Sequence, residues 1–373
     1  MNVQSTQHSL AILGTRGIPA KHGGFETFAE KLSYYLTDRG WEVTVYCQCH
    51  GKHDLHQENW QGVNLVKITL PWNGAKGSIL FDLISACHAA KRTGLLLTLG
   101  YNTAIFSLLH RFRRKQHIMN MDGLEWQRDK WSWPAKAWLY LNERAGCQLA
   151  DHLIADHPII EEHLCSRVRA EKITMIPYGA DEPLDVDLTI FADLGIEPHK
   201  YVLIVARPEP ENSILEMVQA FSVKKRHLKL VVLGSFDATF RYHRAVFSAA
   251  SDEVLFPGAI YEKRKLAALR RYNLVYMHGH RVGGTNPSLV EAMAAGSPVL
   301  AHDNPFNLWV AGPEAAFFAD TDDCSRQLDA LISDGEHLKR MSEASLSRHA
   351  KMFTWPIVLA RYEDVLLRFS GKN

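Results

Sequence analysis

The sequence predicts an α/β protein made of two doubly wound parallel-sheet domains that face a cleft. Short apolar runs alternate with amphipathic helical patterns along the chain, which is typical of a parallel sheet covered by helices on both faces. The alternation stops once, at residues 178–188, where prolines and acidic residues indicate a linker, and then restarts. The length of 373 residues also fits two domains.

The first half begins with a strand and an amphipathic helix. Residues 10–13 form an apolar run, and Phe28, Leu32 and Leu36 then recur at helical spacing up to Gly40. Short apolar or alternating runs predict further strands at residues 42–47, 63–68, 95–99, 117–121, 152–155 and 173–176.

The second half repeats this organisation after a hinge near residue 182. A last helical pattern covers residues 355–369. We therefore expect a first domain at residues 1–181 and a second domain at residues 182–354. The apolar runs of the second half predict strands at residues 201–206, 228–233, 254–256, 274–277, 298–301 and 315–318.

Composition excludes several classes of function. The chain has 42 Lys and Arg against 41 Asp and Glu, a net charge of +1, so no global field is present to hold nucleic acid. Any attraction to phosphate must be local. The six cysteines are scattered, and neither a signal-peptide pattern nor a membrane-spanning run is visible, which predicts a cytoplasmic protein with free thiols.

The loops that follow the strands are the candidate binding elements, because doubly wound sheets bind ligands there. The loop at residues 14–24 follows the first strand. Its glycines, Gly23 and Gly24 among them, let backbone N–H groups approach an anion at a helix start. The loop lacks the Gly-x-Gly-x-x-Gly fingerprint of dinucleotide sites. The alternative is a glycine-rich connection without a ligand.

The loop at residues 280–291 carries the sharpest signal. A glycine pair precedes an Asn-Pro step, which favours an N-cap, a helix start and therefore an anion cradle. Glu291 lies about 7 Å further along the helix axis, which suits a diphosphate at the helix tip and a ribose beside the carboxylate. The alternative for Glu291 is an ordinary surface position. The cradle residues are Gly283, Gly284, Thr285 and Asn286.

Two more loops follow strands. Arg207 can bind a phosphate with its guanidinium, or it can pair with Glu209 or Glu211 instead. Asp122 follows a strand of the first half and can hold a sugar hydroxyl or a leaving proton, while Trp126 can offer an apolar face to a sugar ring. The alternative for Asp122 is to cap the following turn.

A basic run and a cysteine-rich segment are also candidates for binding. The basic run follows the apolar helix at residues 103–109 and can dock an anionic membrane surface, the alternative being a solvated loop. The Cys-Gln-Cys-His segment at residues 47–50 fits no standard zinc spacing, so no metal site is expected. The basic run comprises Arg111, Arg113, Arg114 and Lys115.

At these residues the sequence resembles the retaining glycosyltransferases of family 4, which have the GT-B architecture of two Rossmann-like domains. Residues 22–26, His-Gly-Gly-Phe-Glu, look like that family's first-domain phosphate and acceptor loop. The segment from Arg207 resembles its Arg-x-x-Pro-Glu-Lys phosphate grip, and residues 288–299 resemble its Leu-Glu-Ala-Met-Ala-x-Gly-x-Pro-Val signature. Residues 353–355 resemble the point where such chains cross back, which implies that a helix at residues 355–373 joins the first domain.

Two positions depart from the family pattern. Gly283 stands where the first acid of a Glu-x7-Glu pair is expected, and Asn212 stands at the Lys of the phosphate grip. Both changes are similar to a bacterial branch of rhamnosyltransferases in capsule, O-antigen and exopolysaccharide assembly, which implies dTDP-β-L-rhamnose as the donor. Arg207, Arg281 and backbone N–H groups then have to neutralise the diphosphate.

The resemblance implies transfer of a sugar from a nucleotide diphosphate to an acceptor hydroxyl, with retained anomeric configuration and without a metal or cofactor. His22, Asp122 and Glu291 are the residues expected to act in catalysis. The acceptor-side residues are Arg16, His22, Asp122 and Trp126. The donor-side residues are Gly23, Gly24, Arg207, Asn212, Arg281, Gly283, Gly284, Thr285, Asn286 and Glu291.

The implied acceptor is a saccharide linked to a polyprenyl diphosphate, which predicts a peripheral enzyme at the inner face of the cell membrane. Three alternatives stay open. One is a glycosyltransferase that uses a UDP- or GDP-sugar. Another is an NAD(P)-dependent oxidoreductase, which two Rossmann-like halves suit and the missing fingerprint argues against. The third is a non-catalytic sugar-binding relative, which the departures at Asn212 and Gly283 allow.

Overall fold

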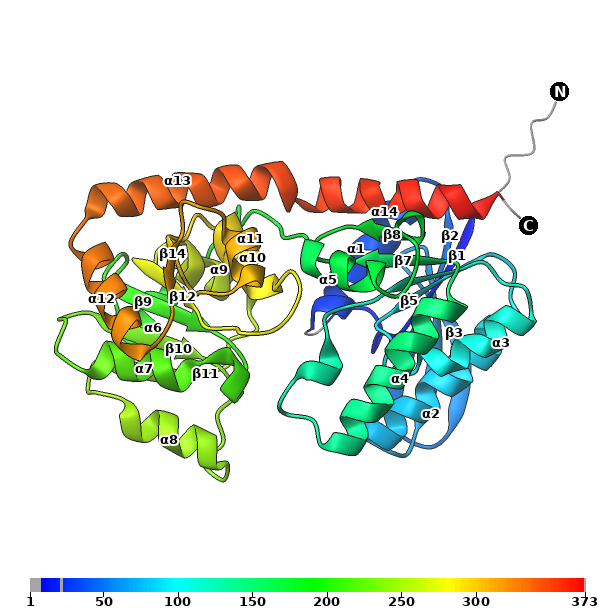
Figure 1. Cartoon of the computed structure of the whole chain (residues 1–373), viewed down its shortest axis with the longest axis horizontal. Coiled ribbons are helices and arrows are strands. Elements are labelled where there is room, and N and C mark those ends of the chain that lie inside the picture. The colour runs from blue at the N-terminus through cyan, green and yellow to red at the C-terminus, as the bar shows by residue number, and fades with distance from the viewer. Residues whose placement is uncertain (1–7, 21–22, 372–373) are drawn as a thin grey trace. The chain divides into compact units, whose positions relative to one another are not determined.

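The computed structural model describes residues 8–20 and 23–371, which form two compact units (Figure 1). The first unit comprises the chain up to Gln127, residues 131–177 and the chain from Trp355. The second unit comprises residues 128–130 and 178–354. Residues 178–181, which the sequence analysis assigns to the first domain, cluster with the second unit, because the backbone N–H of Ala180 donates to the Phe353 carbonyl at 2.8 Å.

The first unit is built on an eight-stranded sheet in the order β3-β4-β2-β1-β5-β6-β7-β8. Neighbouring strands are parallel except for the antiparallel pair β3–β4. The pattern analysis missed β3, because every one of its side chains is exposed and it lacks the apolar alternation of a half-buried strand. The strands are β1 (Ser9–Leu13), β2 (Glu42–His50), β3 (Asp54–Trp60), β4 (Val63–Leu70), β5 (Leu95–Leu99), β6 (His117–Asn120), β7 (His152–Ala155) and β8 (Ile173–Met175).

Helices cover this sheet, and the last helix of the chain is one of them. The predicted helix after β1 is confirmed as α1, with Phe28 and Leu32 buried. In α14, Tyr362 packs its ring 4.5 Å from that of Phe28 and accepts a hydrogen bond from Asn120 Nδ2 at 2.7 Å. The helices and short 3-10 turns are α1 (Gly24–Thr37), α2 (Gly74–Ala89), η1 (Ala104–Phe106), α3 (Ser107–Phe112), η2 (Glu125–Gln127), α4 (Trp133–Leu149), α5 (Pro158–Cys165), η3 (Ala170–Lys172) and α14 (Trp355–Ser370).

The second unit contains a six-stranded parallel sheet in the order β11-β10-β9-β12-β13-β14. Along β9, Tyr201 and Leu203 enter one buried apolar cluster while Val202 and Ile204 enter the other, so the core lies on both faces of the sheet. The strands are β9 (Tyr201–Val205), β10 (Lys229–Leu233), β11 (Val254–Gly258), β12 (Val275–His278), β13 (Val299–His302) and β14 (Ala316–Phe318).

The helices of the second unit alternate with these strands, as the sequence pattern predicts. None of the helices within residues 8–20 and 23–371 combines the length and apolar character needed to cross a membrane. The elements are α6 (Thr189–Leu194), η4 (Pro210–Asn212), α7 (Ile214–Ser222), α8 (Arg241–Ala249), α9 (Lys263–Arg271), α10 (Pro287–Ala294), α11 (Pro305–Ala311), α12 (Thr321–Ile332) and α13 (Gly335–Met352).

Each sheet reverses its strand order at one place. In the first unit the chain moves outward from β1 to β2 and then returns to β5 on the other side of β1. In the second unit it moves from β9 to β10 and returns to β12 on the other side of β9. Loops that leave such neighbouring strands diverge and open a crevice for ligands. The candidate sites therefore lie at the β1–β5 and β9–β12 edges.

Candidate functional site

The loops after β9 and β12 meet at the switch point of the second unit. The backbone N–H of Arg281 donates to the Glu211 carbonyl at 3.0 Å, which ties one loop to the other. A Cβ at Gly279 would lie 2.3 Å from the Asn212 carbonyl oxygen, so the two backbones approach too closely for any side chain there. Glycine at this position thus lets the two loops lie against each other, and together they form the second-unit site.

The loop after β12 leads into the N-terminus of α10. As predicted, Asn286 caps this helix: its side-chain oxygen accepts from the Ser288 backbone N–H at 3.1 Å, and Pro287 occupies the first turn. Gly283 has a φ of 140°, a conformation that favours glycine, and Gly284 and the buried Thr285 lead from it into the cap. A capped helix start after such a loop presents backbone N–H groups and the positive end of the helix dipole to an anion.

Arg207 stands exposed in the facing loop. Its alternative partner Glu211 pairs instead with Arg128, at 2.9 Å. Among the residues that the structure describes, the Arg207 guanidinium makes no ion pair with Glu209 or Glu211. It is therefore available to a ligand anion.

Asn212 and Arg281 have partners within the protein. Asn212 is buried, and its Nδ2 donates to the Arg207 carbonyl at 2.8 Å, so its side chain shapes the loop that carries Arg207. The Arg281 guanidinium donates to Ser213 Oγ and to Glu216 Oε1, each at 2.8 Å, which turns it toward α7. Direct contact of either side chain with a donor stays a prediction.

Glu291 is held by Arg270 of α9. Arg270 Nη2 lies 2.5 Å from Glu291 Oε2, and about a third of the Glu291 side chain is exposed. The carboxylate is thus oriented by an ion pair with an arginine that is itself largely buried. The exposed part is what a ribose would contact, and this contact stays a prediction.

Two stacked histidines lie at the end of β12. The rings of His278 and His280 are 4.3 Å apart and nearly parallel, at 7°. Burial lowers the pKa of His278 to about 3 and holds that of His280 well below its usual range, so both imidazoles are neutral. Neither histidine is among the candidate residues predicted from the sequence. The signal for them is a His-x-His pair that directly follows an apolar strand and precedes the glycine loop.

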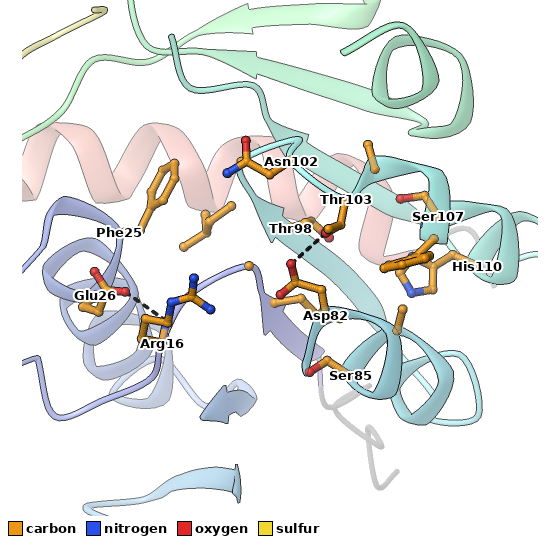
Figure 2. Close-up of a pocket in the computed structure, with 17 residues that line it drawn as sticks. Arg16, Phe25, Glu26, Asp82, Ser85, Thr98, Asn102, Thr103, Ser107 and His110 are labelled. Atoms are coloured by element: carbon orange, nitrogen blue, oxygen red, sulfur yellow. Dashed lines mark hydrogen bonds between the residues drawn. The ribbon is translucent and has the colours of Figure 1, made fainter. Parts of the chain in front are cut away.

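The first unit has a cavity at its own switch point, between the ends of β1 and β5. Its volume is about 190 Å³ (Figure 2). Leu13 and Gly14 line it from the β1 side, and Thr98 and Gly100 line it from the β5 side. The polar groups that enter it include Arg16, Glu26, Asp82, Asn102 and Thr103.

The first-loop residue Arg16 is fixed at this cavity. Glu26, in the first turn of α1, accepts from the Arg16 backbone N–H at 2.9 Å and from Thr15 Oγ1 at 3.4 Å. The Arg16 guanidinium donates to Ser78 Oγ at 2.9 Å and to Gln48. Of the predicted acceptor-side residues that the structure describes, Arg16 alone lines the cavity.

Asp82 is the cavity residue that sequence reasoning missed. Its Oδ2 accepts from Thr103 Oγ1 at 2.8 Å, and Figure 2 shows the two side chains facing each other. Burial raises the pKa of Asp82 to about 6, against the opposing effects of the Thr103 hydrogen bond and the Arg16 charge. The sequence does contain a signal for this residue. Between residues 77 and 90, inside a helical pattern, Asp82 is the single Asp, Glu, Lys or Arg. A carboxylate in such a place can accept a hydrogen bond from a sugar hydroxyl.

The other first-unit predictions lie elsewhere. His22 lies outside the described residues. Asp122 has a φ of 51°, and its backbone N–H donates to Asn120 Oδ1 at 2.8 Å. Trp126 donates its indole N–H to Glu143 Oε2 at 2.6 Å. The cavity lining includes neither Asp122 nor Trp126, so their acceptor roles stay predictions.

The remaining candidates are the glycines of the first loop and the cysteine-rich segment. Gly23, with a φ of 100°, precedes α1, and a Cβ there would lie 2.1 Å from Glu26 Oε2; Gly24 is the first residue of α1. Cys47 lies buried in β2, while His56 pairs with Asp54 on β3. Across the described ranges, no three His, Cys, Asp or Glu side chains are grouped to hold a metal ion.

Two family models match the chain. Residues 187–348 match glycosyl transferases group 1, a stretch that includes the loops after β9 and β12. Residues 7–181 match a domain of unknown function, DUF1972. None of the curated proteins matches the chain.

Solved structures similar over nearly the whole chain have the GT-B fold, which confirms the predicted fold class. Sucrose-phosphate synthase from Thermosynechococcus elongatus superposes with a TM-score of 0.82 at 18% identity, covering 98% of this chain and 100% of that one. Anabaena HepE in complex with UDP and glucose gives 0.76 at 12% identity, covering 96% and 99%. The UDP-forming alpha,alpha-trehalose-phosphate synthase from Burkholderia vietnamiensis gives 0.75 at 10%, covering 97% and 100%. With the group 1 match, this fold supports a GT-B glycosyltransferase.

Proposed function

We propose that the protein is a retaining glycosyltransferase that moves a sugar from a nucleotide diphosphate to a saccharide acceptor. The observation that carries this proposal is the β9–β12 switch point, where the loop that carries Arg207 is hydrogen-bonded to the glycine loop before the capped start of α10. Backbone N–H groups, the helix dipole and a guanidinium are what a leaving diphosphate requires. Glu291, oriented by Arg270, is the proposed ribose ligand.

In the proposed reaction the bond from the sugar's anomeric carbon to the phosphate oxygen breaks. A bond from that carbon to the acceptor oxygen forms on the same face, and the acceptor proton passes to the leaving phosphate. The chain's own groups stabilise the departing negative charge and exclude water from an oxocarbenium-like centre. The stacked imidazoles of His278 and His280 are neutral, so they add no positive charge beside the loop.

For the donor we propose dTDP-β-L-rhamnose, with no metal or cofactor. The support is the pair of departures at Gly283 and Asn212, which the sequence shares with the rhamnosyltransferase branch it resembles. In this chain Asn212 shapes the Arg207 loop and Gly283 leaves the mouth of the anion cradle without a carboxylate. The alternative donor is a UDP-sugar, since HepE is a structural neighbour that binds UDP and glucose.

For the acceptor we propose a saccharide bound at the first-unit cavity, linked to a lipid and used at a membrane surface in polysaccharide assembly. The support is the set of polar groups at the β1–β5 edge: Arg16 as a fixed cation and Asp82 as a half-buried carboxylate. Asp82 is suited to accept a hydrogen bond from an acceptor hydroxyl. The membrane location is supported by exposed apolar side chains on η1, α3 and α4 of the same unit.

Calorimetric titration with dTDP, UDP and GDP tests the donor site, in buffers with and without EDTA. We expect dTDP to bind best, EDTA to have no effect, and Arg207→Ala to weaken binding about tenfold or more, because a charge-assisted contact to phosphate is lost. The control is Arg326→Ala, which removes an exposed arginine from α12 of the same unit. Equal affinity of wild type and Arg207→Ala would exclude Arg207 from the site. Tighter binding of UDP would replace the rhamnose assignment.

A further inference from the structure

The first unit exposes a group of large apolar side chains on η1, α3 and α4, here called the apolar face. Phe112 and Trp133 are 80% and 81% exposed. A side chain that packs inside the protein would have most of its surface covered. Exposed apolar groups of this extent mark interaction surfaces. The apolar face comprises Ile105, Leu108, Phe112, Trp133, Trp138 and Leu141.

The two helical segments of this face are fixed side by side. The Ile105 backbone N–H donates to Asn142 Oδ1 at 3.0 Å, and the Trp138 indole N–H donates to the Asn102 carbonyl at 2.8 Å. Ile105, Leu108 and Phe112 follow each other at helical spacing, so they project from the same side of η1 and α3. The segments that carry the apolar face are therefore held in a fixed arrangement.

Within the two segments, residues 104–116 and 133–149, the exposed charges have one sign, and Asp151 outside them pairs with Arg111 at 3.8 Å. Residues 104–116 contain no acid, and the one acid in residues 133–149 is Glu143. Glu143 is buried and pairs with His163 at 3.0 Å, so it adds no negative charge to the surface. The cations of the two segments are Arg111, Arg113, Arg114, Lys115, Lys136 and Arg144. Apolar side chains surrounded by cations complement an anionic lipid surface.

Helix α3 connects this surface to the cavity. Its Ser107 and His110 line the cavity, while Leu108, Arg111 and Phe112 are exposed on its other side. One helix therefore separates the proposed acceptor site from the apolar face. A saccharide that is still attached to its lipid needs this proximity, because the sugar must reach the cavity while the lipid stays in the bilayer.

We propose that the apolar face is a membrane-docking surface that inserts Phe112 and Trp133 into the headgroup region of an anionic bilayer and so presents the cavity to a lipid-linked acceptor. The acceptor part of this inference rests on the proposed function. Aromatic rings at the level of the headgroups with arginines beside them are the arrangement that a lipid interface favours. A protein partner would favour a recess that an anchor side chain fills, whereas these side chains protrude.

Vesicle flotation tests the docking surface. The full chain is mixed with phosphatidylcholine vesicles that contain either no anionic lipid or about 30 mol % phosphatidylglycerol. We expect binding to the anionic vesicles alone, weakened by salt. The triple variant Arg111→Gln/Arg113→Gln/Arg114→Gln should bind about fivefold more weakly per charge removed. Phe112→Ser/Trp133→Ser should lose binding while it keeps the charge.

Matched controls come from the second unit. Lys224→Gln/Lys225→Gln removes two exposed cations, and Leu184→Ser removes an apolar side chain that is as exposed as Phe112; both should bind vesicles like wild type. Absence of wild-type binding, or equal binding by the triple variant, would overturn the proposal. Heparin serves as a second, non-lipid polyanion. If Phe112→Ser/Trp133→Ser binds both heparin and anionic vesicles as tightly as wild type, the proposal is also overturned, and an acidic macromolecule is indicated as the partner.

The proposed transferase activity is checked separately. With a water-soluble acceptor, the surface variants should turn over like wild type, and with a lipid-linked acceptor in vesicles they should be slower. A chain that binds anionic vesicles and transfers no sugar to either acceptor would contradict the proposed function while leaving the docking surface intact.

Discussion

Asp82 carries a charge inside an apolar stretch of α2, and its surroundings change how that charge behaves. Burial raises its pKa to about 6, so the carboxylate is ionised at neutral pH and takes up a proton in mild acid. A protonated Asp82 no longer offers the same acceptor to a sugar hydroxyl. The activity should therefore depend on the protonation state of this one group.

We expect kcat/KM for the acceptor to fall as the pH drops below about 6, the pKa of Asp82. Asp82→Asn should lower kcat/KM about tenfold or more at pH 8 and remove this acidic limb, because a hydrogen bond to a charged group is lost. Initial-rate measurements from pH 5 to 8 check both effects, in buffers in which the enzyme stays folded. An Asp82→Asn variant with the wild-type profile would remove Asp82 from the acceptor site.

Thr103→Val distinguishes a positioned carboxylate from a merely buried one. The Thr103 hydroxyl donates to Asp82 at 2.8 Å, and this bond lowers the Asp82 pKa. Its loss should raise that pKa, so the acidic limb should move to higher pH while the activity at pH 8 falls less than in Asp82→Asn. A limb that stays in place would indicate that another group titrates.

At the scale of elements, the second-unit site depends on how closely the loops after β9 and β12 approach. A Cβ at Gly279 would meet the Asn212 carbonyl oxygen at 2.3 Å and Met217 Cε at 2.7 Å. The backbone oxygen cannot give way as a flexible side chain does. The two loops must therefore separate to accept even a methyl group.

Gly279→Ala should lower the free energy of unfolding by about 1–3 kcal/mol, as overpacking does, and weaken nucleotide binding by displacing the Arg207 loop. Urea denaturation and calorimetry measure the two effects. Gly335→Ala is the control, because a Cβ at the start of α13 meets no atom within 4 Å. If Gly279→Ala has the stability and nucleotide affinity of wild type, the loops have room that the structure does not show.

Element prediction succeeded where burial leaves a pattern in the sequence. The parallel strands from β1 to β14 are apolar because helices cover both faces, and α1 is amphipathic because one side of it faces the sheet. The strand β3 has no such pattern, because its residues Asp54–Trp60 are all exposed. It is a strand only because it forms hydrogen bonds with β4. Tertiary pairing, which the local pattern does not record, creates that strand.

At the scale of the whole molecule, buried histidines dominate the response to acid. Burial lowers the pKa of His110 and His152 to about 4 and that of His278 to about 3, and it holds His117 and His280 well below the usual range. Between these values and the unfolded pKa of about 6.5, the unfolded chain binds protons that the folded chain refuses. The stabilisation by neutral histidines is therefore present above pH 6.5 and lost as the pH falls.

Each such histidine should contribute a slope of up to about 1.4 kcal/mol per pH unit below pH 6.5, so Tm should fall steeply from pH 7 to pH 5. Asp82 opposes this trend with one group, since its raised pKa favours the folded state in acid. His152→Gln should make the dependence of Tm on pH shallower by the contribution of one histidine. A flat Tm between pH 7 and pH 5 contradicts the expectation.

The sequence by itself determined the two-unit α/β architecture and the α10 cradle, from Gly283 to Asn286. The reason is that periodicity, capping and loop glycines are local properties, which neighbouring residues encode. The sequence also indicated Arg207 as a phosphate ligand. The alternative was an ion pair with Glu209 or Glu211, and in the structure Glu211 pairs with Arg128 instead.

Only the tertiary structure decided what the remaining polar groups do. It brought Arg16, Asp82 and Thr103 from three separate segments to one cavity, and it paired Arg281 with Glu216 and Glu291 with Arg270. Such contacts join residues far apart in the chain, so their formation depends on how β1 and β5, or α9 and α10, are placed by the sheet. A local pattern shows that a residue is charged, and packing decides whether that charge meets a ligand, a neighbouring side chain or a membrane.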